Sequence, residues 1–155
     1  MSRRNRILLT KAGWLLFYLY IVMLCYFLFF SEHYGRNDIM PEYKSNLILF
    51  REIRRFIIYR HQIGLERFLV NILGNIFAFA PFGFLLPLLN KRYRKFYLIT
   101  LLTLLFSLSV ETIQLIFRVG IFDVDDLLLN TTGGIAGYIF YKFVCLLAGN
   151  KRKSR

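Results

Sequence analysis

The sequence predicts an all-α fold: a polytopic membrane protein in which four transmembrane helices form a bundle and a further helix lies at the extracytoplasmic interface. Of its 155 residues, 57% are hydrophobic, and the mean hydropathy is +0.49. The charged residues make up 19% of the chain and gather between long apolar segments. A soluble domain of this length could not bury so much apolar surface, so we expect one integral membrane domain over residues 1–155.

The four predicted spans cover about residues 12–30, 68–89, 96–117 and 127–147. At a rise of about 1.5 Å per residue, each is long enough to cross a hydrocarbon core of about 30 Å. The arginines before the first span also resemble the start of a signal peptide. However, the apolar segment is too long for one, and FFSEHYG after it has no small-residue cleavage motif. We therefore expect an uncleaved anchor.

Lysines and arginines gather before the first span, between the second and third spans, and after the fourth. With four spans, all three clusters fall on one side, which the positive-inside rule assigns to the cytoplasm. We expect a multi-pass membrane protein with cytoplasmic termini, an outside loop over 31–67 and a cytoplasmic tail over 148–155. The net charge of +12 does not indicate nucleic-acid binding, because the basic residues border apolar spans and no base-stacking motif is present.

Within the outside loop, the segment REIRRFIIYR (51–60) has the pattern of an amphipathic helix. At about 100° per residue, its arginines and its apolar residues fall mostly on opposite sides. We expect a short helix in the outer headgroup layer. Two roles remain open: its arginines contact lipid phosphates, or it only caps the bundle.

The third span carries a polar stripe in its outer half. Glu111 is the critical member, because a carboxylate within a bilayer costs several kcal/mol unless it is paired, protonated or hydrated. We expect either a hydrogen-bonded Glu–Gln–Arg ladder or a protonated Glu111 with a raised pKa. The stripe consists of Ser107, Glu111, Gln114 and Arg118, which fall within an arc of about 60° on a helix.

Spans two and four carry amides at a similar depth, and small residues beside them allow close helix packing. The sequence therefore predicts a polar pocket that opens to the outside. Its predicted ligand-binding residues are Asn71, Asn75, Glu111, Gln114, Arg118, Asp123, Asp126 and Asn130, and its predicted structural residues are Pro81, Gly83, Gly133, Gly134 and Gly137. Two alternatives remain open: the amides only join helices, and Asp125 or Asp126 only caps the fourth span.

Three segments together resemble the VanZ-like family of small bacterial membrane proteins: NILGNIFAFAPFGFLLPLL (71–89), SVETIQLIFRVG (109–120) and FDVDDLLLNTTGGIAGY (122–138). NLILF (46–50) resembles a further family element, with Leu49 where proline is usual. The resemblance covers roughly residues 45–140. It implies a polytopic protein linked to reduced susceptibility to teicoplanin-type glycopeptide antibiotics, and it supplies no agreed reaction.

Two functions of different class follow. In the first, the pocket binds the headgroup of a membrane lipid or of a lipid-linked cell-wall precursor, and an acyl-bearing glycopeptide antibiotic is a further candidate ligand. In the alternative, an intramembrane transferase or hydrolase uses Glu111 as acid or base and Arg118 to stabilise charge, with Asp123, Asp125 and Asp126 as candidates for Mg²⁺. No cofactor or resident metal is expected, and the sequence predicts no oligomeric state.

Overall fold

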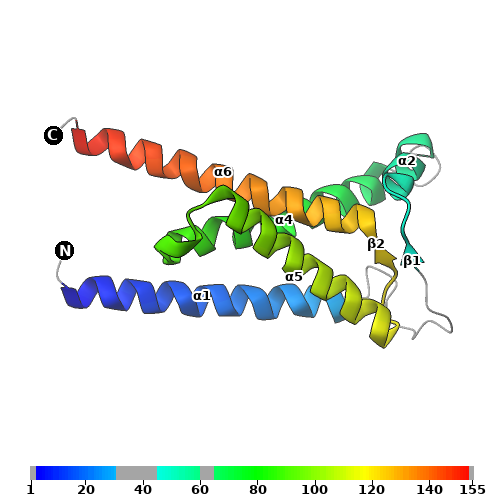
Figure 1. Cartoon of the computed structure of the whole chain (residues 1–155), viewed down its shortest axis with the longest axis horizontal. Helices are drawn as coiled ribbons and strands as arrows, with labels where there is room; N and C mark the ends of the chain where they lie inside the picture. The colour runs from blue at the N-terminus through cyan, green and yellow to red at the C-terminus, as the bar shows by residue number, and fades with distance from the viewer. Residues whose placement is uncertain (1–2, 31–44, 60–64, 154–155) are drawn as a thin grey trace.

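The computed structural model (Figure 1) describes residues 3–30, 45–59 and 65–153. Four of its helices are long and apolar enough to cross a membrane, which confirms the predicted all-α, polytopic architecture. The elements are α1 (Arg3–Phe30), β1 (Ser45–Asn46), α2 (Arg51–Ile58), α4 (Leu65–Leu89), the 3₁₀ helix η2 (Lys91–Tyr93), α5 (Phe96–Phe117), β2 (Phe122–Asp123) and α6 (Val124–Lys153).

The helices cover the predicted spans, and three of them extend beyond the predicted bounds. α5 covers the same residues as the predicted third span, and α2 lies where the amphipathic segment predicted a helix. α6 continues to Lys153, so most of the predicted tail over 148–155 is helical, while the apolar span itself ends at Ala148. Basic side chains are favourable near a helix C-terminus, so the helix can continue beyond the apolar segment. Residues 31–44 and 60–64 of the predicted outside loop lie outside the described residues.

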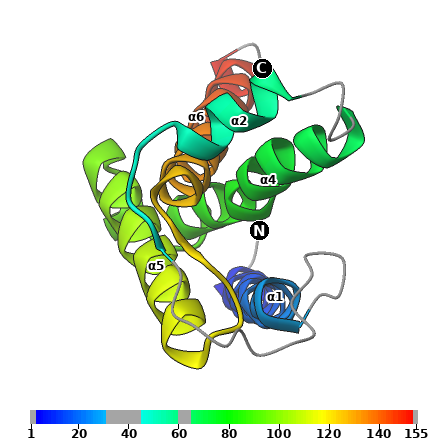
Figure 2. The ribbon, with the colours of Figure 1, turned by 90° about the vertical axis from the view of Figure 1, so that its right-hand side faces the viewer.

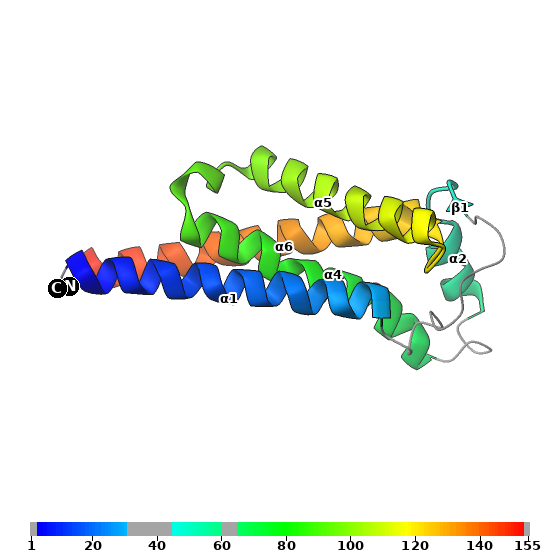
Figure 3. The same cartoon turned by 90° about the horizontal axis from the view of Figure 1, so that it is seen from below.

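The long helices run along a common direction, with both chain termini at one end and α2, β1 and β2 at the other (Figures 1 and 3). We call these the terminal end and the α2 end. Viewed from the α2 end, α2 lies across α4 and α6, and α1 lies on the other side of α4 (Figure 2). The link between α4 and α5 is at the terminal end. The start of α4 and the end of α5 therefore both lie at the α2 end.

The closest helix pair is α4 with α6, and glycine makes this approach possible. A Cβ atom on Gly83 would collide with the carbonyl of Gly134, and one on Gly137 would collide with the carbonyl of Ala80. A Cβ on Gly133 would likewise meet the backbone of Ile76. These positions therefore need glycine because the two backbones leave no room for a side chain.

Aromatic rings join α1 and α5 to this pair. The rings of Phe82 and Phe106 stack with centroids 5.2 Å apart, and Phe17 packs against Phe82 at 5.9 Å. Pro81 lies inside α4 and removes a backbone donor from it. Near this proline, the Tyr20 hydroxyl of α1 donates a 2.6 Å hydrogen bond to the carbonyl of Ala78. Hence α1 contacts α4 through ring packing and through a polar bond.

The glycine contacts give a matched pair of substitutions. We expect Gly137→Ala to lower the free energy of unfolding by about 1–3 kcal/mol, because the added methyl group meets backbone that cannot move aside. Gly13→Ala would meet only the end of the Leu89 side chain, and we expect it to be neutral or slightly stabilising. Unfolding of the purified protein in detergent micelles measures both. Equal effects would contradict the close α4–α6 approach.

Candidate functional site

The polar residues of α5 lie on one buried face of the helix. Thr103, Ser107, Glu111 and Gln114 are all buried, and Glu111 is only 3% exposed. Successive members are three or four positions apart, so they share the side that packs against α6. The residues between them, such as Leu104 and Leu108, are exposed on the other side of the helix.

Amide side chains join the three helices that the sequence predicted to meet. Asn130 of α6 donates to the Ser107 hydroxyl of α5 at 2.9 Å. Asn75 of α4 donates to the Asp126 carboxylate of α6 at 2.6 Å. Polar groups from α4, α5 and α6 therefore meet near the α2 end, and they do so through direct contacts between side chains.

Asp123 connects Glu111 to the start of α6. Its backbone N–H donates to Oε2 of Glu111 at 3.2 Å, and its carboxylate accepts from the N–H of Asp125 at 2.8 Å. The second bond makes Asp123 the N-cap of α6. The expectation that Asp125 or Asp126 caps this helix is therefore wrong, because the helix begins at Val124, directly after Asp123.

Asn46 was not predicted as a site residue. β1 and β2 form a short parallel pair in which Asn46 lies opposite Asp123. Its side-chain amide donates to the Asp123 carboxylate at 3.1 Å and its oxygen accepts from the N–H of Ile48 at 3.3 Å. The available signal was that Asn46 begins the NLILF element. Asn46 thus attaches the segment that precedes α2 to the start of α6.

The electrostatic environment of Asp123 combines opposing effects. Burial raises the pKa of this carboxyl above its ordinary value. Hydrogen bonds from the Asp125 N–H and the Asn46 amide, and the positive charge of Arg55, lower the pKa and oppose this shift. Asp123 therefore lies in a buried environment in which hydrogen-bond donors and a nearby cation compensate for lost water.

Asp125 caps α2, although it belongs to α6. This carboxylate is 1% exposed, and it accepts hydrogen bonds from the N–H groups of Phe50 (2.5 Å) and Ile53 (3.3 Å). Phe50 precedes the first residue of α2 and has a left-handed backbone, with φ of 64°. A non-glycine residue adopts this conformation only when its surroundings stabilise it. Asp125 supplies this stabilisation and attaches α2 to the bundle.

Gln114 contacts a helix that the sequence did not connect to the pocket. Its amide donates at 2.8 Å to the carbonyl of Leu28, near the end of α1. This bond attaches α1 to α5 at the α2 end. Asn71 is half-buried and lies one turn before Asn75 on α4.

Arg118, the last member of the predicted stripe, lies at the C-cap of α5 and not within the helix. The prediction assumed a helix through residue 118, but α5 ends at Phe117 and Arg118 has a left-handed backbone, with φ of 57°. Its N–H bonds to the carbonyl of Leu115, and the N–H of Val119 bonds to the carbonyl of Gln114. Arg118 thus terminates α5 through its left-handed backbone.

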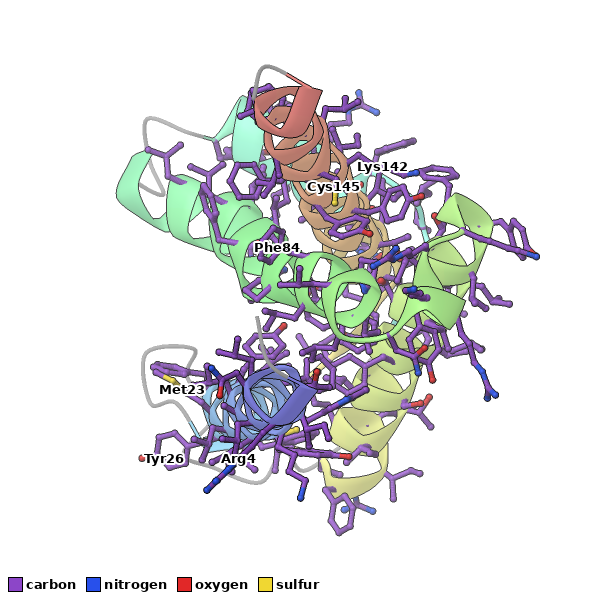
Figure 4. The ribbon with its side chains drawn as sticks, turned by 90° about the vertical axis from the view of Figure 1, so that its left-hand side faces the viewer. Arg4, Met23, Tyr26, Phe84, Lys142 and Cys145 are labelled. Carbon is purple, nitrogen blue, oxygen red and sulfur yellow. The ribbon has the colours of Figure 1, made fainter. Side chains whose placement is uncertain are left out.

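Three surface grooves are lined by described residues. One, of about 370 Å³, lies between α1 and α4, and Asn75 forms part of its wall. A second, of about 470 Å³, is apolar and lies between α4 and α6, where Phe84 packs against Phe140. Figure 4 labels Phe84 on α4. A third, of about 420 Å³, is lined by α2 and the residues before it.

The aspartates at the start of α6 have separate protein partners. Asp123 accepts from Asn46, Asp125 accepts from Phe50 and Ile53, and Asp126 accepts from Asn75. Among the described residues, no three His, Cys, Asp or Glu side chains are grouped as metal ligands. The carboxylates thus hold helices and loops in place.

With this geometry established, the chain can be compared with known proteins. A model of the VanZ/LLP1 family matches residues 17–146. The chain belongs to the VanZ/LLP1 family. The match confirms the resemblance in the sequence and extends it to α1. Protein VanZ of Enterococcus faecium is 37% identical over 71 residues, which are 46% of this chain and 44% of that protein. The similarity therefore covers less than half of that relative, and no solved structure matches.

The contacts of Asp125 predict the effect of removing it. In Asp125→Ala, the N–H groups of Phe50 and Ile53 lose their acceptor. We expect their amide hydrogen exchange to accelerate by about tenfold or more, since a lost charged acceptor costs about 1.5–3 kcal/mol. Asp126→Ala is the control, because it breaks the bond to Asn75 instead. Unchanged exchange in Asp125→Ala would show that Asp125 does not hold α2.

Proposed function

We propose that this multi-pass member of the VanZ/LLP1 family binds a membrane lipid or a lipid-linked cell-wall precursor. The hydrocarbon chain would lie in the groove between α1 and α4, and the headgroup would lie at the α2 end. The single observation that carries this proposal is the form of the groove. Its lining is mainly apolar, with Asn75 near the α2 end and the Tyr20 hydroxyl bonded to the carbonyl of Ala78.

The distribution of apolar and polar residues along the groove matches that of a lipid, which has a long apolar chain and a polar headgroup. Its α4 side extends from Gly74 to Pro81, and its α1 side from Tyr20 to Leu28. Both segments belong to the membrane-spanning parts of their helices. Asn75 is the polar residue nearest the α2 end, where it contacts Asp126. An acyl or prenyl chain would pack against the apolar wall, and a polar headgroup would lie next to the Asn75 amide and the Asp126 carboxylate.

Charge distribution supports an orientation with both termini in the cytoplasm. The basic residues of η2 and its flanks lie at the terminal end, as do those near the start of α1. By the positive-inside rule, this end faces the cytoplasm and the α2 end faces outward. The ligand would then come from the outer leaflet of the bacterial cytoplasmic membrane. A link to teicoplanin-type susceptibility would follow if an acyl-bearing glycopeptide occupied the same surface.

The burial of Glu111 favours binding over catalysis. A general acid or base must reach the atom with which it exchanges a proton. Glu111 is 3% exposed, accepts from the Asp123 N–H, and lines none of the three grooves described above. Its bond to the Asp123 N–H supports the start of α6. We therefore rank intramembrane catalysis below lipid binding as the function of this protein.

Filling the groove tests the proposal. Ala78 lines the α1–α4 groove, so Ala78→Phe places a ring where the chain would lie. We expect the lipid that remains bound to the purified protein to fall by at least about fivefold, which corresponds to about 1 kcal/mol. Native mass spectrometry of the detergent-solubilised protein measures the bound lipid.

The matched control is Ala136→Phe, which makes the same change in the α4–α6 groove. We expect it to leave lipid binding unchanged, because the polar residue Asn75 is not part of that groove. Thermal unfolding establishes that both variants remain folded. Equal loss in the two variants, or no loss in either, would refute the assignment of the α1–α4 groove.

A further inference from the structure

The groove on α2 combines arginines with apolar side chains. Its volume is about 420 Å³, and Arg51, Arg54 and Arg55 are all exposed along it. The apolar part of its lining comes from Ile48, Leu49, Phe50 and Ile58. A surface of this kind differs from the other two grooves, which are lined mainly by apolar residues.

The apolar residues before α2 indicate where this groove lies relative to the membrane. Leu47, Ile48, Leu49 and Phe50 are consecutive, and each is more than half exposed. A continuous apolar patch next to arginines, at the end of a membrane-spanning bundle, is typical of a segment in the headgroup and acyl boundary. In that layer, the apolar side chains contact the start of the acyl chains and the guanidinium groups are at the level of the phosphates.

The arginines are presented on a fixed support. A helix of eight residues is marginal by itself, but α2 is held at its start by the buried carboxylate of Asp125. The charge of Arg55 acts on Asp123, which places this residue beside the buried network. Arg51 and Arg54 are one turn apart and line the same groove, so both can reach one ligand.

We propose that Arg51 and Arg54 bind the phosphate of an anionic membrane lipid, with Leu47–Phe50 in contact with its acyl chains. The planar guanidinium can donate to two phosphate oxygens at once, and two such groups one turn apart match the charge of a phosphomonoester or diphosphate. This inference rests on the proposed function, in which the ligand is a lipid. It adds a second lipid-contacting surface, the groove on α2, and the headgroup class that this surface recognises.

The test uses the full chain in detergent micelles and short-chain phosphatidic acid as the probe. The variant Arg51→Gln/Arg54→Gln removes two charges from the groove. The control Lys91→Gln/Arg92→Gln removes two charges from the exposed surface of η2, at the terminal end. Short-chain phosphatidylcholine and inorganic phosphate are the comparison ligands. Thermal unfolding and size-exclusion chromatography establish that every variant is folded.

We expect phosphatidic acid to bind the wild type more tightly than phosphatidylcholine. The arginine variant should lose about 25-fold in affinity, at about fivefold for each charge near a phosphate layer. The control variant should retain the wild-type affinity. Inorganic phosphate should not compete at millimolar concentration, which would identify the lipid as the source of the phosphate.

Equal affinity of the two double variants for phosphatidic acid would overturn the inference. The inference would also fail if inorganic phosphate competed as strongly as the lipid does. The site would then bind free phosphate and not a lipid headgroup. Failure of the proposed function gives a different result, namely that Ala78→Phe retains all phospholipid binding. If Ala78→Phe loses lipid while the arginine variant does not, the proposed function stands and this inference falls.

Discussion

Hydrogen bonding of polar side chains inside an apolar bundle is the constraint on which this structure depends. A polar group buried away from water costs free energy unless it finds a partner, and lipid offers few. At the α2 end the partners are other parts of the same chain. Asn75 bonds to Asp126 and Asn130 bonds to Ser107, so each amide joins two helices. The polar residues that would destabilise separate helices thus hold the helices together.

The constraint reaches beyond the membrane-spanning helices. Asp123 and Asp125 are two residues apart, yet they bond to different segments: one to Asn46 of β1 and the other to the start of α2. Close packing of α4 on α6, which needs glycine at positions such as Gly83 and Gly137, brings short side chains within reach of one another. The loop segments and α2 are therefore attached to the α4–α6 pair, and α4 also forms one wall of the α1–α4 groove.

Apolar length and helical periodicity were sufficient to predict the four spans, the amphipathic helix and the buried stripe of α5. These features are local, since each follows from residues within one segment. Arg118 shows the limit: a left-handed residue that ends α5 depends on the turn after it, and periodicity cannot show it. The Asn46–Asp123 and Gln114–Leu28 bonds join residues 77 and 86 positions apart, and no local pattern specifies such partners. The N-cap of α6 was expected at Asp125 or Asp126, whereas the helix begins earlier and Asp123 caps it.

The central claim is that Asn75 and Asp126 stabilise the bundle through a direct bond. A double-mutant cycle with Asn75→Ala, Asp126→Ala and the double variant measures this most directly, through the free energy of unfolding in detergent micelles. The structure predicts a coupling free energy of about 1 kcal/mol, within the range of interhelical hydrogen bonds in membranes. Additivity of the two single effects to within about 0.3 kcal/mol would contradict the claim.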